Sequence, residues 1–281
     1  MQEYFFQNID YLCVPGSATS PCEDLVHVNE DWLLLMDGAS PLAPSSMEPS
    51  DAAWFVREAD RLLSSRIHLP LMEALRDSMK LIRRSWKGTS ENMPSSGIVF
   101  LRLVQEDLQY LLLGDCTLSL ELVDGSFLTV EDNALCRLDR IALAELQDHA
   151  ARLGKFPREC LPLIQETLRR HRDLRNTPDG YYILDPSGRG LPYSKTGSIP
   201  ARKIRSVFLT TDGFSQLREF TGEESFSSFH KRAKKEGLSS LLGELHHMQE
   251  QDSSFDRLPR FKFRDDATSI IAKVMRKGDL V

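Results

Sequence analysis

The sequence predicts an α+β protein in which helices pack on the outside of β-sheets. Two observations lead to this prediction: apolar segments of strand length come in groups, and helical patterns come in adjacent pairs. A doubly wound fold would instead alternate one strand with one helix, so the grouping favours separate layers. With 281 residues and a hydrophobic content of 41%, the chain can bury a substantial core, and we expect residues 1–281 to form a single domain.

The predicted strands are short apolar segments bounded by turn residues or by charges. They are Trp32–Met36, Ile98–Val104, Leu108–Leu113, Leu118–Val123, Val207–Thr211 and Thr268–Val274. Short polar connections at Gln105–Asp107 and Gly114–Asp115 separate the segments between residues 97 and 123, so we expect these strands to form a meander.

The predicted helices lie between these strands. The first pair covers about Ser50–Ile67 and Leu71–Trp86, the second covers about Ala134–Leu153 and Arg158–Leu174, and further helix is expected within Glu223–Gln251. Each pair needs a sheet to cover its apolar face. The Gly- and Pro-rich stretch Asp179–Ser198 is predicted to be a loop, and it is our candidate for a flap that sets substrate preference.

The composition excludes several classes of protein. A net charge of −6 and a pI near 5.7 argue against nucleic-acid binding, which needs clustered Lys and Arg. The N-terminus lacks the features of a secretion signal and no run of 18 apolar residues occurs, so we expect a cytoplasmic protein without a membrane partner. The cysteines are odd in number and lack regular spacing, which indicates reduced thiols rather than disulfides or a zinc site: Cys13, Cys22, Cys116, Cys136 and Cys160.

Acidic residues stand next to several predicted strands. Asp37 and Asp212 follow apolar strands, Asp265 precedes one, and Asp115 comes after a fourth. Carboxylates gathered at buried strand ends repel one another unless cations neutralise them. Because no Cys or His stands at ligand spacing, the pattern favours Mg²⁺ or Mn²⁺ over Zn²⁺. One Asp-Gly pair is usually only a turn, but two that follow apolar strands, with an Asp-Asp before a third, weaken that interpretation.

Short motifs around these acids resemble the metal-dependent protein phosphatases of type 2C. The matches run in order through most of the chain, and five in sequence are more specific than any one alone. The family's early Glu-Asp element is matched by Cys22-Glu23-Asp24, and its Asp-Gly element by Leu35-Met36-Asp37-Gly38. Its Gly-Asp-Ser element is matched by Leu113-Gly114-Asp115-Cys116. The last two matches are Thr211-Asp212-Gly213, which resembles Ser-Asp-Gly, and Asp265-Asp266-Ala267-Thr268, which resembles Asp-Asn-x-Thr.

This resemblance implies a fold and an activity. The fold is a four-layer αββα sandwich, in which two antiparallel β-sheets are flanked by helical pairs, and residues 1–281 are a single type 2C-like catalytic domain. The activity is hydrolysis of phosphoserine and phosphothreonine in proteins, and a Ser/Thr kinase or its targets are the expected partners. Two Mn²⁺ or Mg²⁺ ions, with a weaker third, are the implied cofactors.

The resemblance also implies a role for each matching acid. Asp37 bridges two metals, the Gly38 carbonyl binds one of them, and Asp212 with Asp265 completes the other site. A water between the two metals then attacks phosphorus in line without a covalent intermediate.

The remaining matches have supporting roles in this scheme. Glu23 and Asp24 hold metal-bound waters, and Asp115 joins Asp212 at the third metal. A metal-bound water aided by Asp115 protonates the leaving group. The catalytic residues implied are therefore Asp37, Asp212 and Asp115.

The sequence departs from the family pattern in three places. Ala39-Ser40-Pro41 stands where many members have His-Gly-Gly, so the proposed histidine proton donor is missing. The stretch Gly16–Ser20 lacks the arginine that binds phosphate, and Pro94–Gly97 replaces a Gly-Ser-Thr turn. Another cation, or the metals themselves, must therefore hold the substrate phosphate.

Other functions fit the sequence less well. A Ser-His-Asp hydrolase would need a Gly-x-Ser-x-Gly elbow, and a phosphoaspartate enzyme would need a second acid two residues after Asp37. His246 and His247 point about 100° apart on a helix, which favours exposed or capping roles. The main rival is a type 2C-like binding or regulatory module that has lost efficient catalysis, although such a module would have no electrostatic reason to keep the acids clustered.

Overall fold

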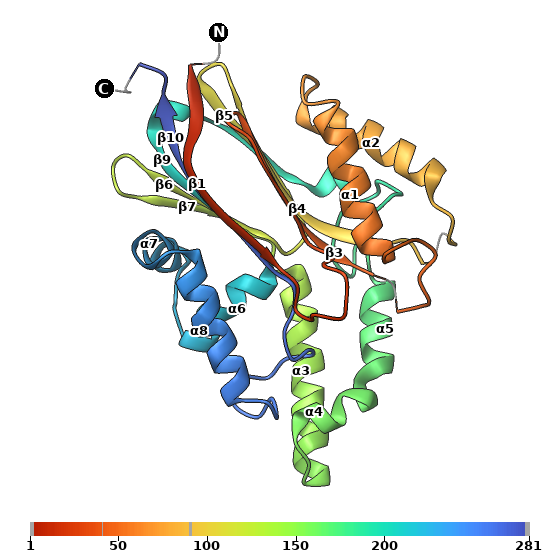
Figure 1. Ribbon diagram of the computed structural model, residues 1–281. Helices are drawn as coiled ribbons and strands as arrows, with labels where there is room; N and C mark the ends of the chain where they lie inside the picture. The colour runs from red at the N-terminus through yellow and green to blue at the C-terminus, as the bar shows by residue number, and fades with distance from the viewer. Residues whose placement is uncertain (1–2, 41, 90–91, 279–281) are drawn as a thin grey trace.

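Two antiparallel five-stranded β-sheets, with helices outside them, form the core of the protein. The structure is a computed structural model that describes residues 3–40, 42–89 and 92–278. Figure 1 shows helices against the outer face of each sheet, so the predicted α+β class and layered sandwich are confirmed. No helix in these described ranges has the length and apolar character needed to cross a membrane.

The strand order explains how distant segments meet. One sheet has the order β1 (Tyr4–Val14), β10 (Ala267–Arg276), β9 (Ile204–Thr210), β6 (Thr117–Leu122) and β7 (Phe127–Val130). The other has the order β2 (Leu25–Val28), β3 (Trp32–Ala39), β4 (Ser95–Val104), β5 (Asp107–Leu113) and β8 (Lys195–Pro200). The predicted meander holds for β4 and β5 only. Beyond Gly114, where φ is +88°, the chain crosses to the other sheet and β6 pairs with β9.

The main core lies between the sheets. Leu33 and Leu35 of β3 point inward and join a buried cluster that includes Leu118 of β6 and Leu209 of β9. The alternate residue Leu34 points outward toward the helices. Both faces of the central strands are therefore buried, which explains why the sequence shows continuous apolar runs rather than alternation.

Helices α1 (Asp51–Ser64) and α2 (Leu71–Ser85) cover the outer face of the β3–β4 sheet, as predicted for this pair. The Ser50 side chain caps α1 by accepting a hydrogen bond from the backbone N–H of Ala53 at 3.1 Å. This helix pair and its sheet share the second buried cluster, which contains Met36, Phe55, Leu63, Met79, Phe100 and Leu111.

Three other helices cover the outer face of the second sheet: α6 (Asp212–Thr221), α7 (Phe226–Glu236) and α8 (Leu238–Gln251). Phe208 of β9 stacks edge-on against Phe214 of α6 and Phe229 of α7. Helix α6 has no counterpart among the predicted helices, and the helix expected within Glu223–Gln251 is divided at Gly237, where φ is +83°.

The predicted second helical pair does not cover a sheet, so that expectation is wrong. Helix α3 (Ala134–Leu153) has the predicted bounds, but the expected continuous partner is divided into α4 (Pro157–Cys160), a 3₁₀ turn and α5 (Gln165–Asp173). Pro162 lies in that turn and cannot continue an α-helix. The three helices form their own small apolar cluster beside one end of the sandwich (Figure 1, green).

Candidate metal centre

Four acids from different segments converge at one end of the sandwich. Asp37 lies in β3, and Asp115 lies between β5 and β6. Asp212 is the first residue of α6, directly after β9, and Asp265 lies just before β10. Strand register brings these segments together, because Thr210 of β9 pairs both with β6 and with β10.

Two threonines join the segments that carry Asp212 and Asp265. The backbone N–H of Thr211 donates to the Thr268 carbonyl at 3.0 Å. In return, the backbone N–H of Thr268 donates to Thr211 Oγ1 at 3.1 Å. Both threonines are fully buried, so this reciprocal pair fixes the spacing of the two acids.

Asp266 is a positioning residue that the sequence analysis did not assign. Its Oδ1 accepts a hydrogen bond from the Gly16 N–H at 2.8 Å, and its Oδ2 accepts one from the Glu23 N–H at 2.6 Å. The carboxylate therefore anchors the segment that carries Glu23 and Asp24 against β10. The Asp265-Asp266 pair was visible in the sequence, but only the structure shows that the two acids have different partners.

The glycines after Asp37 and Asp212 serve close packing rather than turns. Gly38 lies within β3 and Gly213 lies within α6, so neither Asp-Gly pair forms a turn. A Cβ atom on Gly38 would lie 2.2 Å from the Glu23 carbonyl oxygen, and one on Gly213 would lie 2.0 Å from the Asp266 carbonyl oxygen. Only glycine lets these backbone segments approach so closely.

Asp24 and Asp37 have strongly raised pKa values. Burial, followed for Asp37 by the charges of Asp24, Asp212 and Asp115, raises the pKa of each carboxyl well above its usual range. One buried oxygen of each, Oδ2, contacts no hydrogen-bond partner in the described part of the chain. Buried acceptors without a partner are rare in folded proteins, so these two oxygens are available to a ligand.

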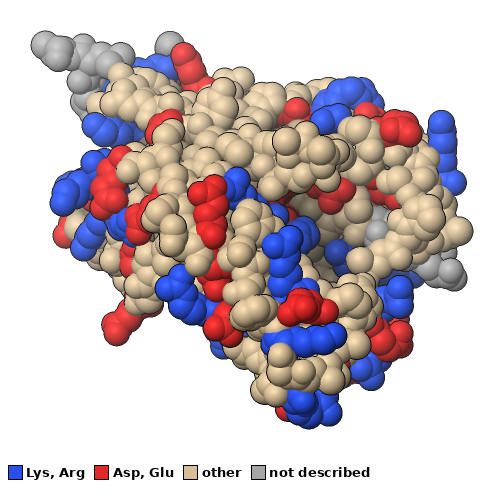
Figure 2. Space-filling view, turned by 60° about the horizontal axis from the view of Figure 1, so that its bottom comes forward, with Lys and Arg blue, Asp and Glu red and all other residues tan. Residues whose placement is uncertain are grey.

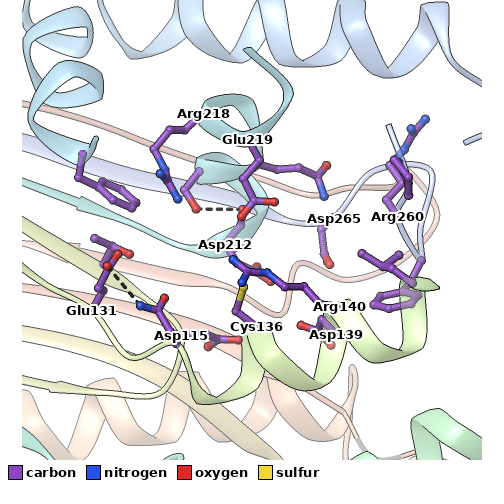
Figure 3. A pocket seen from close by; sticks show the side chains of 18 of the residues that line it. Asp115, Glu131, Cys136, Asp139, Arg140, Asp212, Arg218, Glu219, Arg260 and Asp265 are labelled. Carbon is purple, nitrogen blue, oxygen red and sulfur yellow. Dashed lines mark hydrogen bonds between the residues drawn. The ribbon is translucent and has the colours of Figure 1, made fainter. Parts of the chain in front are cut away.

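The other acids open onto a cleft of about 560 Å³ between α3, α6 and the segment before β10. Asp115, Asp212 and Asp265 line this cleft together with Asp139 of α3 (Figure 3). Figure 2 shows a hollow on this end of the molecule, with acidic side chains inside it and basic side chains around it. Asp212 remains accessible to solvent in the cleft, so water screens its charge more than that of Asp37.

Asp139 was not predicted as a site residue because it lies within a helix, in the second turn of α3. Burial, followed by the charge of Asp212, raises the pKa of Asp139 to about 7. The same two causes raise the pKa of Asp115 to about 8. A single acid within a helical pattern gives no signal in a sequence, since its approach to the strand-end acids depends on how α3 packs.

The donor atoms fit a hard divalent cation. Asp37, Asp115 and Cys116 present one ligand atom each within 4.8 Å of one another. Burial raises the pKa of the Cys116 thiol well above its usual value, so it stays protonated and is a poor ligand. The remaining donors are carboxylate oxygens, as Mn²⁺ and Mg²⁺ prefer.

Lys262 contributes a positive charge at the same place. Its Nζ lies 2.6 Å from Asp265 Oδ1. Burial alone would lower the pKa of Lys262. The charges of Asp265, and then of Asp212 and Asp37, raise this pKa above its usual value. The ammonium therefore neutralises part of the cluster.

Glu23 has protein partners of its own. Its carboxylate accepts hydrogen bonds from the hydroxyls of Ser40 and Ser50, the latter at 2.6 Å, and from the Ser40 N–H at 3.3 Å. The acid thus ties the loop after Asp37 to the start of α1. Pro41, the last residue of the altered Ala39-Ser40-Pro41 loop, lies outside the described residues.

The raised pKa values predict that the metal-free protein loses stability above neutral pH. An acid whose folded pKa exceeds its unfolded value binds more protons when folded, so stability falls as pH rises through the folded pKa. For Asp139, with a folded pKa of about 7, its contribution to the free energy of unfolding should fall by about 1 kcal/mol between pH 6.5 and 8.5.

Urea unfolding in EDTA at these two pH values measures this effect. The range begins at pH 6.5 because burial lowers the pKa of His230 to about 4, which gives the opposite trend below that pH. The Asp139→Asn variant is the control, since it should show a smaller fall than the parent protein. An equal fall in both proteins would contradict the assignment to Asp139.

Comparisons with known proteins support the fold. No protein-family model matches the sequence, and no curated protein matches it either. The catalytic domain of serine threonine protein phosphatase PstP, in complex with two manganese ions, is 14% identical, with a TM-score of 0.54 over 97% of this chain and 99% of that chain. The Mycobacterium tuberculosis phosphatase PstP/Ppp is 15% identical, with a TM-score of 0.53 over 96% and 98%.

A third solved structure agrees. The PPM Ser-Thr phosphatase MsPP from Mycobacterium smegmatis, in complex with cacodylate, is 11% identical, with a TM-score of 0.50 over 95% of this chain and 98% of that chain. At such low identities these likenesses establish the fold. The resemblance to the type 2C, or PPM, phosphatases that five short motifs predicted is thus confirmed in the arrangement of the chain.

Proposed function

We propose that residues 1–281 form one catalytic domain, a metal-dependent phosphatase that hydrolyses phosphoserine and phosphothreonine in proteins. The observation that carries this proposal is the convergence of Asp37, Asp115, Asp212 and Asp265 at one end of the sandwich, where Asp37 Oδ2 is buried and has no hydrogen-bond partner among the described residues. The solved phosphatases that share the fold support the same activity.

Each acid has a proposed role toward Mn²⁺ or Mg²⁺. Asp37 would bind two ions through its two oxygens, with the Gly38 carbonyl as a further ligand. Asp212 and Asp265 would complete the second site, and Asp115 with Asp212 would hold a weaker third ion. Bound cations would offset the repulsion within the cluster, stabilise charge on the phosphoryl oxygens and acidify the attacking water.

The chain itself supplies the positioning. Asp24 lies buried beside Asp37, and Asp266 holds the backbone of the Glu23–Asp24 segment in place, which would orient these two acids toward bound water. Asp115 opens onto the cleft beside Asp212, so it is placed to assist protonation of the leaving group. The Asp179–Ser198 stretch remains our candidate for substrate preference, although its last four residues belong to β8 rather than to a loop.

Hydrolysis should depend strictly on a divalent metal. We expect turnover of p-nitrophenyl phosphate and of a phosphothreonine peptide with Mn²⁺ or Mg²⁺, and a loss of at least about 100-fold in EDTA, because the acids alone repel an anionic substrate. Asp212→Ala should lower turnover similarly, and the exposed variant Asp107→Asn should not. Activity that persists in EDTA and in Asp212→Ala would rule out the metal mechanism.

The rival function is a binding or regulatory module. Two observations favour it: Ala39 and Ser40 replace the histidine-containing loop, and Lys262 already pairs with Asp265. Two bound Mn²⁺ ions in calorimetry without turnover of either substrate would support the module. A Ser/Thr kinase or its phosphorylated targets are the candidate partners for either function.

A further inference from the structure

An arginine from α5 reaches the loop that follows Asp37. Arg172 Nη1 donates a hydrogen bond to the carbonyl oxygen of Ser40, across 132 positions of the chain. The hydroxyl and N–H of the same serine hold the carboxylate of Glu23. The guanidinium is therefore attached to the loop that connects the acid cluster to α1.

The Arg172 guanidinium has more N–H donors than it has acceptors among the described residues. It carries five N–H groups, yet within the described residues the Ser40 carbonyl is its one acceptor and no carboxylate lies within ion-pair distance. Arg175, one turn further along, is different: it donates to the Met93 carbonyl at 2.6 Å and lies 3.8 Å from the Asp185 carboxylate. The Arg175 guanidinium therefore already has protein partners, whereas N–H groups of Arg172 remain available to an anion.

The surroundings of Arg172 favour an anionic ligand. Burial lowers the pKa of Arg172 most, Tyr181 raises it, and the neighbouring charge of Arg175 lowers it. Glu23 and Asp139 act in the opposite direction, which places the guanidinium within electrostatic reach of the acid cluster. A partly buried cation that lacks a direct counter-ion is costly, and a bound phosphate would offset that cost.

We propose that Arg172 binds the phosphoryl oxygens of the substrate, in place of the arginine that the Gly16–Ser20 stretch lacks. A planar guanidinium can hold two phosphoryl oxygens at once. This inference rests on the proposed phosphatase function, and it gives the α3–α5 helices a role: they carry the substrate-binding cation to the metal centre.

Inorganic phosphate is the probe that tests this site directly. Calorimetry on the Mn²⁺-loaded protein would compare the parent with Arg172→Met, Arg172→Lys and Arg169→Met. Arg169 is the matched control, because it lies on the same helix, is mostly exposed and, among the described residues, forms one ion pair, with Glu166 at 4.0 Å. We expect phosphate affinity to fall about 10- to 100-fold in Arg172→Met, by less in Arg172→Lys, and not at all in Arg169→Met.

Two further readouts separate a binding role from a structural one. Mn²⁺ affinity should be unchanged in all three variants, and for p-nitrophenyl phosphate KM should rise in Arg172→Met while kcat changes much less. If Arg172→Met fails to fold, Arg172→Lys decides the question. Phosphate affinity and KM equal to those of the parent in whichever Arg172 variant folds would overturn the proposal, as would a parent protein that binds no phosphate.

The outcomes also distinguish this proposal from the function on which it rests. A parent protein that binds phosphate through Arg172 but hydrolyses neither substrate would refute the phosphatase function and support the arginine site. Conversely, metal-dependent hydrolysis with no effect of Arg172→Met on phosphate affinity or KM would refute the arginine site alone.

Discussion

Asp37→Asn is expected to abolish Mn²⁺ binding at the acid cluster and to lower kcat/KM for p-nitrophenyl phosphate by about 1,000-fold or more. The reason is that Asp37 lies at the centre of the group: the charges of Asp24, Asp212, Asp115 and Asp265 all act on its carboxyl. An amide keeps the size of the side chain but removes the negative charge that two cations would share. Calorimetry and steady-state kinetics measure the two effects.

The same substitution should have the opposite effect on the metal-free protein. Without a cation, the buried Asp37 charge repels its neighbours, so its removal should raise the free energy of unfolding in EDTA by about 1 kcal/mol or more at pH 8. Asp107→Asn, in an exposed position of β5, should leave stability and metal binding unchanged. Lower stability of Asp37→Asn in EDTA would show that this acid has a structural role instead.

The acids of this site could be predicted because they stand at or near the ends of strands. Asp37, Asp115, Asp212 and Asp265 each stand in or next to a hydrophobic segment, and the edge where such segments end is a place where their side chains meet. Arg172 could not be predicted in the same way. It lies in a helix whose position depends on packing between α3 and α5, and no local pattern encodes that position.

The fold shows the same division between local and distant causes. The bounds of α3 were predictable because Gly154 ends it in a left-handed conformation, with φ of +62°. The strand β8, Lys195–Pro200, was predicted as loop because it is a polar edge strand without alternation. β1 was missed as well, since a bulge between Gln7 and Asp10 interrupts its pattern.

Gly213→Ala should destabilise the protein strongly, by about 3 kcal/mol or more. Its Cβ would lie 2.0 Å from the Asp266 carbonyl oxygen, a backbone atom that cannot rotate away. Asp266 also holds the N–H groups of Gly16 and Glu23, so any displacement would pass to the segment that carries Asp24. Weaker Mn²⁺ binding should therefore accompany the lower stability, as urea unfolding and calorimetry can measure.

Gly243→Ala is the matched control, because it makes the same change within α8 where, apart from the helix's own backbone and the adjacent residues, no described atom lies within 4 Å of the new Cβ. Alanine favours a helix over glycine by up to about 1 kcal/mol, so this variant should be slightly more stable and bind Mn²⁺ normally. The two substitutions should thus have opposite signs although both lie in helices. A stabilising effect of Gly213→Ala would contradict this explanation, because it would show that the close approach of α6 to Asp266 does not require glycine after Asp212.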